Sequence, residues 1–199
     1  MRSQLLSRAY ASAPLLLFLA TLGWGSNTIA SRLAVGEVSP MLLIFFRWGI
    51  VVVILVIFYW RQMIAYWPLI RPRLKRRPKI SGMVMLAYFS VAAFLMTIPL
   101  MIAESLTYGT VIPGARGCAI VLYIALVPSF LSQIFFMRGV DLIGPGSAGL
   151  YANLVPVFSA IMAVLLLSEK FAFFHLAAML LVFGGIALFE YQSRRKVEP

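Results

Sequence analysis

The chain has 199 residues, of which 62% are hydrophobic and 12% are charged. Soluble domains contain about 45–50% apolar and about 25% charged residues, so this composition is that of a membrane protein. The net charge of +11 comes from 17 basic and 6 acidic residues. A nucleic-acid-binding protein would need a polar folded surface to carry those basic residues, and the long apolar stretches leave no sequence for one. The length also leaves no room for a soluble catalytic domain.

The residues that build most enzyme and metal sites are scarce. Cys118 is the single cysteine, which excludes a disulfide framework within one chain, and His175 is the single histidine, so no Cys/His cluster exists to hold a metal. The carboxylates are not clustered either, and no nucleophile–base pair can be assembled from them. We therefore expect no enzyme activity, no metal and no cofactor.

Six charge-poor stretches divide the chain, and each is long enough to cross a bilayer, which takes about 20 apolar residues. They are residues 13–31, 41–60, 83–103, 118–137, 146–168 and 171–189. Each ends at a charge, a proline or a glycine. None shows the ten-residue alternation of apolar and polar side chains that marks a membrane barrel. The sequence predicts an all-α polytopic bundle of about six transmembrane helices.

The basic residues predict the orientation of this bundle. With six crossings, thirteen basic residues fall on the side of the two termini and three on the opposite side. The thirteen are Arg2, Arg8, Arg61, Arg71, Arg73, Lys75, Arg76, Arg77, Lys79, Arg138, Arg194, Arg195 and Lys196; the three are Arg32, Arg116 and Lys170. Short cytoplasmic loops carry an excess of Lys and Arg, so both termini are predicted to be cytoplasmic.

Two of these basic segments have alternative interpretations. The loop from Arg71 to Lys79 could bind anionic lipid head groups, but a solvated topology determinant is the favoured interpretation. Arg2 and Arg8 before an apolar run are similar to a signal peptide. Because no small-residue cleavage site follows cleanly, we interpret this run as an uncleaved first helix.

Prolines interrupt three of the predicted spans. Pro99, Pro128 and Pro156 remove a donor from the third, fourth and fifth spans, and the carbonyls that lose it belong to Leu95, Ile124 and Ala152. In lipid a freed carbonyl needs another partner or a cavity. A packing kink explains any one proline, but three together favour a cavity of the kind that broken helices line in transporters.

Polar residues inside two spans are candidates for a substrate pathway. In the first span, Trp24, Asn27 and Ser31 share one helical face, although neighbouring small residues indicate tight helix packing as an equal alternative. In the fifth span, Tyr151 and Asn153 precede Pro156. We expect Asn153, beside the proline-freed carbonyl, to be the best ligand contact in this half of the chain. Small residues at four-residue spacings in the same span suit close packing: Ala148, Ala152, Ser159 and Ala163.

Arg47 is the charged residue placed deepest in a predicted span. It lies roughly 10 Å below the outer end of the second span at 1.5 Å per residue. Charges at such depth normally have a partner, and Glu104 at the outer end of the third span could supply it. We predict an Arg47–Glu104 pair, with a structural role favoured over substrate binding. Both Glu104 and Glu169 sit at span ends, so the residues do not indicate proton coupling.

Two passages resemble the EamA-type transporters of the drug/metabolite transporter superfamily. Repeats of this family open with Trp-Gly-Ser/Asn and continue to a Ser-Pro before a second helix that contains Arg. The corresponding residues here are Trp24, Gly25, Ser26, Asn27, Ser39, Pro40, Phe46 and Arg47. Such repeats end with Pro-Val midway along the penultimate helix, a Glu at the next turn and a Gly-rich last helix. The corresponding residues are Pro156, Val157, Glu169, Gly184 and Gly185.

The resemblance covers residues 13–60 and 83–190 and implies a transporter of small metabolites. Family members typically have ten helices in two inverted repeats, so this chain resembles one that lacks about four central helices. It divides into residues 1–80, the start of one repeat with the basic loop, and 81–199, the four-helix end of another.

The resemblance to this family predicts a permease that exports small metabolites or drugs across a bacterial inner membrane. Its partners are the lipid bilayer, a small molecule and, for a complete pathway, a second copy in a homodimer; no nucleic acid is expected. The alternative is a shortened membrane protein or subunit that does not transport.

Overall fold

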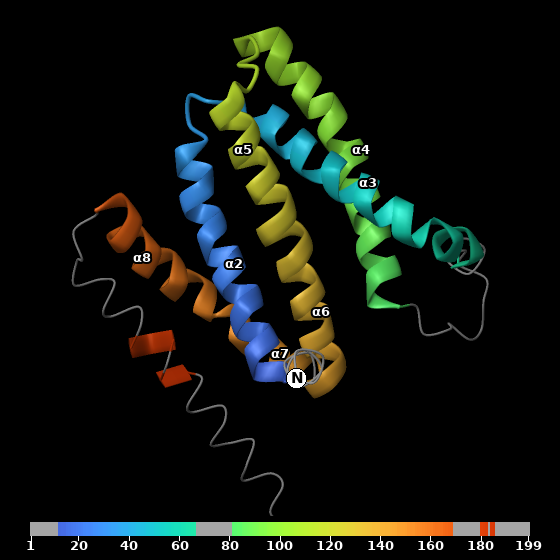
Figure 1. Cartoon of the computed structure of the whole chain (residues 1–199), viewed down its shortest axis with the longest axis vertical. Helices are drawn as coiled ribbons and strands as arrows, with labels where there is room; N and C mark the ends of the chain where they lie inside the picture. The colour runs from blue at the N-terminus through green and yellow to red at the C-terminus, as the bar shows by residue number, and fades with distance from the viewer. Residues whose placement is uncertain (1–11, 67–80, 169–179, 183, 186–199) are drawn as a thin grey trace, which may run out of the picture.

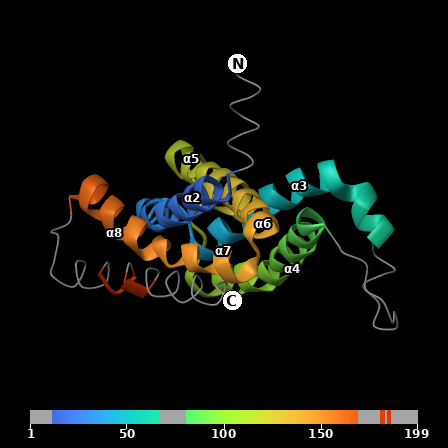
Figure 2. The same cartoon turned by 90° about the horizontal axis from the view of Figure 1, so that it is seen from below.

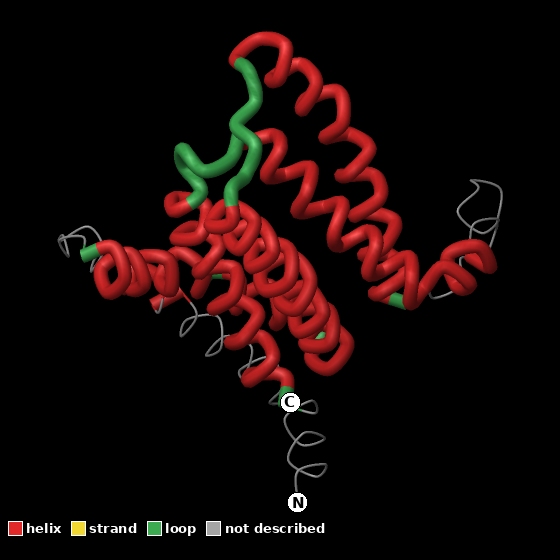
Figure 3. The backbone as a smooth tube through the Cα atoms, turned by 45° about the horizontal axis from the view of Figure 1, so that its top comes forward, coloured by secondary structure: helices red, strands yellow, loops and turns green. Residues whose placement is uncertain are grey.

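The computed structural model describes residues 12–66, 81–168, 180–182 and 184–185. These residues form helices joined by short turns, with no strand among them (Figure 3). Among these described residues, five helical stretches are long and apolar enough to cross a membrane: Ala13–Leu33, Pro40–Tyr66, Gly82–Tyr108, Ala115–Ile143 and Pro145–Leu167. The predicted all-α bundle is confirmed. The sixth predicted span, 171–189, lies almost entirely outside the described residues.

The first three spans are single helices, α2 (Ala13–Leu33), α3 (Pro40–Tyr66) and α4 (Gly82–Tyr108). The fourth consists of α5 (Ala115–Ile124), the π-helix η2 (Ala125–Leu131) and α6 (Ser132–Ile143). The fifth consists of α7 (Pro145–Ala152) and α8 (Leu154–Leu167), which meet at Asn153. Successive spans run in alternate directions (Figure 1), as expected when short loops connect neighbouring membrane helices.

Glycine-containing turns end helices at both ends of the bundle (Figure 1). Gly109 after α4 has a φ of 77°, and Gly144 after α6 has a φ of 82°, a left-handed conformation that a side chain disfavours. The turn before α3 is tied to the turn after α4, because Val111 donates its N–H to Ser39 Oγ at 2.7 Å while the N–H of Ser39 donates back to the Val111 carbonyl at 3.2 Å. This exchange holds the ends of the second, third and fourth spans together.

The bundle has a central layer of α2 with the α5–α6 helix, flanked by α3 and α4 on one side and α8 on the other (Figures 1 and 2). Two apolar clusters hold it. One joins the end of α2 to the start of α3 and to α5, through Ala30, Ala34, Val38, Leu42, Leu43, Val121 and Ile124. The other joins α3 to α4 through Val51, Leu55, Leu86 and Ala87. Large apolar side chains also point outward, with Phe58 of α3 73% exposed and Met96 of α4 70% exposed, which suits contact with lipid rather than water.

Glycines let α2 approach its neighbours closely. A Cβ added at Gly23 would lie 2.1 Å from Ser132 Oγ of α6, and one at Gly25 would lie 2.7 Å from Phe158 Cβ of α8. Small residues at such crossings allow backbones to pack directly in a membrane. The first span was interpreted either as the wall of a substrate pathway or as a site of tight helix packing. For its glycines, tight packing is confirmed.

The three prolines have different structural effects. Pro99 lies inside α4, which continues on both sides of it, so the helix accommodates this proline without an interruption. Pro128 lies in η2, where a wider turn pairs each carbonyl with the N–H five residues on and so bypasses the missing donor. Pro156 follows the interruption of the fifth span at Asn153.

Candidate functional site

The C-terminal half of α2 carries hydroxyl groups on two sides. Ser26 and Thr28 are two residues apart, so at about 100° per residue they point about 200° apart around the helix axis. A cavity lies on each of these sides. One cavity separates α2 from α5, and the other separates α2 from α8. We take these two cavities as the candidate site.

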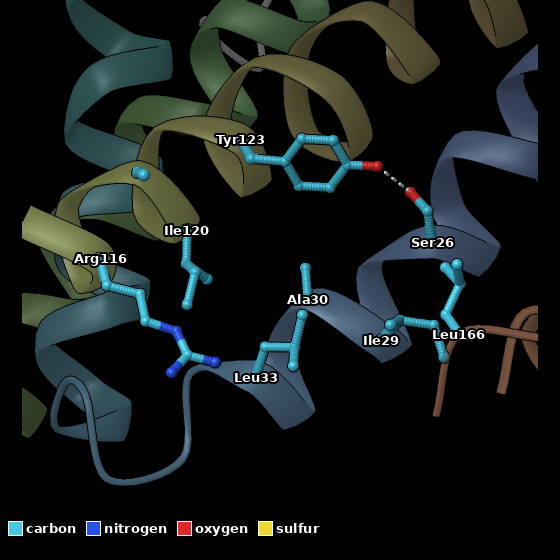
Figure 4. A pocket seen from close by; sticks show the side chains of 9 residues that line it. Ser26, Ile29, Ala30, Leu33, Arg116, Ile120, Tyr123 and Leu166 are labelled. Atoms are coloured by element: carbon cyan, nitrogen blue, oxygen red, sulfur yellow. Dashed lines mark hydrogen bonds between the residues drawn. The ribbon is translucent and has the colours of Figure 1, made fainter. Parts of the chain in front are cut away.

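The cavity beside α5 has a volume of about 370 Å³, within the range of about 300–1,000 Å³ that is usual for small-molecule sites. It is lined by Ser26, Ile29, Ala30, Leu33, Arg116, Ala119, Ile120, Tyr123 and Leu166 (Figure 4). Its walls are apolar and its polar groups lie at its two ends.

At one end, the Tyr123 hydroxyl donates to Ser26 Oγ at 2.8 Å, and Ser26 Oγ donates to the Gly23 carbonyl at 2.7 Å. The oxygen of Tyr123 therefore keeps acceptor capacity toward the cavity. At the other end, Arg116 Nη1 lies 3.4 Å from Glu37 Oε1, and the Arg116 side chain is 68% exposed. A pair this exposed is weak, so the guanidinium is available to an anionic ligand. An apolar cavity with polar groups at its two ends fits an amphipathic solute.

The cavity beside α8 has a volume of about 410 Å³. It is lined by Thr28, Arg32, Val155, Pro156, Ser159, Ala160 and Ala163. Thr28 and Ser159 share a hydrogen bond of 3.1 Å across it, and Ser159 Oγ donates to the Gly25 carbonyl at 3.2 Å. These two bonds fasten α2 to α8 at the edge of the cavity.

Deeper in the bundle, a polar cluster surrounds the π-helix. Arg47 Nε donates to Ser129 Oγ at 2.5 Å, and Ser129 Oγ donates to the Ile124 carbonyl at 2.7 Å. From the opposite side, Trp24 Nε1 donates to the Pro128 carbonyl at 3.1 Å. The cluster therefore binds α2 and α3 to the π-helix that contains Pro128.

The Ile124 carbonyl is the one that the sequence predicted to need a new partner. Ser129 supplies that partner, and it was not among the candidate residues predicted from the sequence. The signal that could have found it is a hydroxyl side chain directly after the proline, five residues beyond the freed carbonyl.

The predicted Arg47–Glu104 pair is wrong. Glu104 Oε2 accepts the N–H of Met41 at 2.9 Å, and Arg47 extends to Ser129 instead. The first N–H groups of a helix lack internal partners and carry partial positive charge, so a carboxylate is favoured there. Glu104 therefore caps α3, and the described residues hold no ion pair between the two.

The three predicted residues of the first span have different environments. Trp24 packs on Phe136, with ring centroids 4.9 Å apart, and donates to the π-helix. Asn27 is half-buried, and its Oδ1 has no hydrogen-bond partner among the described residues. Ser31 is exposed. None of the three lines either cavity; Ser26 and Thr28 of the same helix do.

Of the three candidates predicted in the fifth span, Tyr151, Asn153 and Pro156, only Pro156 lines one of the two cavities. Asn153 is exposed at the junction of α7 and α8, and its N–H donates to the Leu150 carbonyl at 3.1 Å. Tyr151 is half-buried. The structure therefore separates Tyr151 and Asn153 from the cavity that Pro156 lines. In the part of the chain that the structure describes, no three His, Cys, Asp or Glu side chains come together to hold a metal.

Five apolar helices of spanning length, apolar side chains on the outside and polar groups gathered between helices define a polytopic integral membrane protein. The EamA-like transporter family matches residues 63–191. The chain belongs to this family, as its motifs indicated, and is thus a membrane protein of the transporter kind in the drug/metabolite transporter superfamily. The match begins in the last turn of α3, so the resemblance of residues 13–60 stays a prediction. No curated protein and no solved structure matches the chain.

Proposed function

We propose that the chain exports small amphipathic metabolites or drugs, which bind in the cavity between α2 and α5. The observation that carries this proposal is the chemistry of that cavity. Its walls are apolar, a hydroxyl pair, Ser26 and Tyr123, lies at one end, and Arg116 lies at the other. An amphipathic molecule satisfies both kinds of surface, whereas a polyanion would leave most of its charge against apolar side chains.

The cavity beside α8 supports a transport route through the bundle rather than a single closed binding pocket. Both cavities adjoin the same half of α2, and weak hydroxyl bonds, Thr28 to Ser159 and Ser159 to Gly25, close the side toward α8. Asn153 separates α7 from α8 without a side-chain cap, so we propose this junction as the hinge about which α8 moves. Motion of one helical unit against another around a site is the usual form of alternating access.

We further propose that both termini face the cytoplasm of a bacterial cell and that the protein lies in its inner membrane. The predicted distribution of Lys and Arg supports this orientation. Arg32 and Arg116 would then lie on the outer side, where the cavities are. We also propose that two copies assemble, because a second set of helices would enclose cavities that the described residues leave open. Cross-linking of the purified protein as a dimer is the expected result.

Transport is tested by filling the cavity beside α5. Ala119 is exposed on α5 and lines the cavity, so Ala119→Trp occupies it without disturbing buried packing. The measurement is the flux, in proteoliposomes, of a panel of radiolabelled amphipathic acids, amines and alcohols. We expect flux to fall about tenfold, the effect of losing about 1.4 kcal/mol of binding.

The matched control is Leu122→Trp, because Leu122 lies on the same helix, is 49% exposed and does not line the cavity. Equal flux in the two variants would contradict the proposed site. A wild-type protein that stays monomeric and moves none of the solutes would contradict transport itself and favour a non-transporting membrane subunit.

A further inference from the structure

We propose that the guanidinium of Arg47 is a binding group for a single anionic oxygen group, a carboxylate or a phosphate, at membrane depth. The site lies between α3 and η2 and is separate from both cavities, whose linings do not include Arg47. It does not depend on the proposed function, because binding can be measured without transport.

A charge as deep in a spanning helix as that of Arg47 costs free energy unless an opposite charge or hydrogen-bond acceptors neutralise it. Arg47 is the eighth residue of α3, about 10 Å along the helix from Pro40 at 1.5 Å per residue. Ionisable side chains within a spanning helix normally pair with an opposite charge or line a polar space. Arg47 therefore requires a counter-charge or an equivalent set of acceptors.

The described residues supply only part of that requirement. Nε of Arg47 donates to Ser129, and the guanidinium lies 5.3 Å from the centroid of the Trp48 ring. The two terminal nitrogens have no hydrogen bond or ion pair within the described residues, and they are not among the buried unpaired atoms. The part of the guanidinium that carries four N–H donors is thus both unpaired and accessible.

The described residues contain three carboxylates, and none of them pairs with Arg47; Asp141 is exposed near the end of α6. Glu104, the carboxylate expected to neutralise Arg47, caps Met41, and Glu37 faces Arg116. Ser129 directs its own hydrogen to the Ile124 carbonyl, so it accepts from Arg47 and does not compete as a donor. The counter-charge must come from outside the described residues.

The geometry selects the chemistry of the ligand. Ser129 fixes Nε and Trp48 lies beside the guanidinium, so the side chain is held in one orientation with its outer edge free. A planar pair of N–H groups in a fixed orientation matches two oxygens of a carboxylate or phosphate. Such a group can belong to a small amphipathic acid or to the head of an anionic lipid.

Two binding measurements on the full chain test the proposal and distinguish these sources. The first is scintillation-proximity binding of radiolabelled phenylacetate to protein in phosphatidylcholine nanodiscs, with unlabelled 2-phenylethanol as the neutral competitor. The second is native mass spectrometry of phosphatidylglycerol retained by protein from mixed phosphatidylcholine and phosphatidylglycerol micelles. Arg47→Gln removes the charge, Arg47→Lys keeps it without the planar fork, and Arg61→Gln removes an exposed arginine of the same helix that lines neither cavity.

We expect Arg47→Gln to weaken binding at least about tenfold in one arm, Arg47→Lys to weaken it less, and Arg61→Gln to leave that arm unchanged. Loss in the phenylacetate arm identifies an acidic solute as the ligand, and loss in the lipid arm identifies a lipid head group. Equal binding by wild type and Arg47→Gln in both arms would overturn the proposal.

If Arg47→Gln does not fold, chemical modification of the wild-type protein tests the proposal instead. An arginine-specific glyoxal reagent should modify Arg47, and phenylacetate or phosphatidylglycerol should protect it while 2-phenylethanol should not. Mass spectrometry of the peptide containing Arg47 measures this protection. Unprotected modification in the presence of both anions would also overturn the proposal.

Discussion

Replacing Ser129 with alanine tests whether the hydroxyl holds the π-helix to α3. The variant loses the bond that Ser129 donates to the Ile124 carbonyl and the acceptor that Arg47 Nε uses. A lost bond to a charged group costs about 1.5–3 kcal/mol in soluble proteins, and polar bonds between membrane helices average about 0.6 kcal/mol with a maximum of about 1.7. The Arg47 bond joins two spans and belongs near the upper membrane value, whereas the Ile124 bond lies within one span and adds less than about 0.5 kcal/mol. We expect Ser129→Ala to lower the free energy of unfolding by about 2 kcal/mol.

Ser90→Ala is the matched control, because Ser90 and Ser129 are both 0% exposed. Ser90 Oγ donates to the Leu86 carbonyl at 2.8 Å within α4, and that carbonyl also receives a helical N–H, so its loss should cost less than about 0.5 kcal/mol. The measurement is equilibrium unfolding of both variants in mixed dodecylmaltoside and dodecyl sulfate micelles, followed by circular dichroism. If Ser129→Ala unfolds no more readily than Ser90→Ala, the hydroxyl does not have the stabilising role inferred from its two bonds.

Two further substitutions test the contacts of α2 and α3. Gly25→Ala places a Cβ 2.7 Å from Phe158 Cβ and 3.2 Å from the backbone nitrogen of Ser159, so we expect about 1–3 kcal/mol of destabilisation from overpacking. Gly146→Ala meets nothing within 4 Å and is the control; similar unfolding of both glycine variants would argue against the α2–α8 crossing. Glu104→Ala removes the acceptor for the Met41 N–H and should cost about 1 kcal/mol, whereas Glu104→Gln keeps an oxygen there and should cost less. Unfolding in the same micelles measures these differences, and a Gln variant as weak as the Ala variant would count against capping as the role of Glu104.

Arg47 and Glu104 show why the helices could be predicted and their polar partners could not. The sequence placed Arg47 inside the second span and Glu104 near the end of the third, and their opposite charges made a pair the natural expectation. In the structure Glu104 accepts from Met41 and Arg47 donates to Ser129, so the two charged residues do not pair with each other. Which partner each one takes depends on which atoms the packing of α3, α4 and η2 brings within hydrogen-bond distance. Helix periodicity fixes a residue along and around its own helix, but it does not fix the rotation of that helix against another.

In the candidate site, too, the sequence predicted the helix but not which of its side chains line the cavities. Trp24, Asn27 and Ser31 were chosen because they share a face of the first span, yet the cavities adjoin Ser26 and Thr28. The tight crossings at Gly23 and Gly25 set how α2 is rotated, and that rotation turns Trp24 toward η2 and directs the two small hydroxyls to the cavities. Small hydroxyl residues are common in membrane helices, so nothing in the first span marked these two before their neighbours were known.

The sequence by itself determined that this is an all-α membrane protein with spans at these positions, and its motifs indicated the EamA family. The physical reason is that a segment in lipid must satisfy its backbone hydrogen bonds internally, so local hydropathy is enough to define each helix. The tertiary structure alone decided that η2 relieves the strain at Pro128, that Ser129 joins it to Arg47, and that cavities flank α2. These features depend on side-chain contacts between spans far apart in the chain, and in a membrane such contacts follow from close packing and hydrogen bonding rather than from hydropathy.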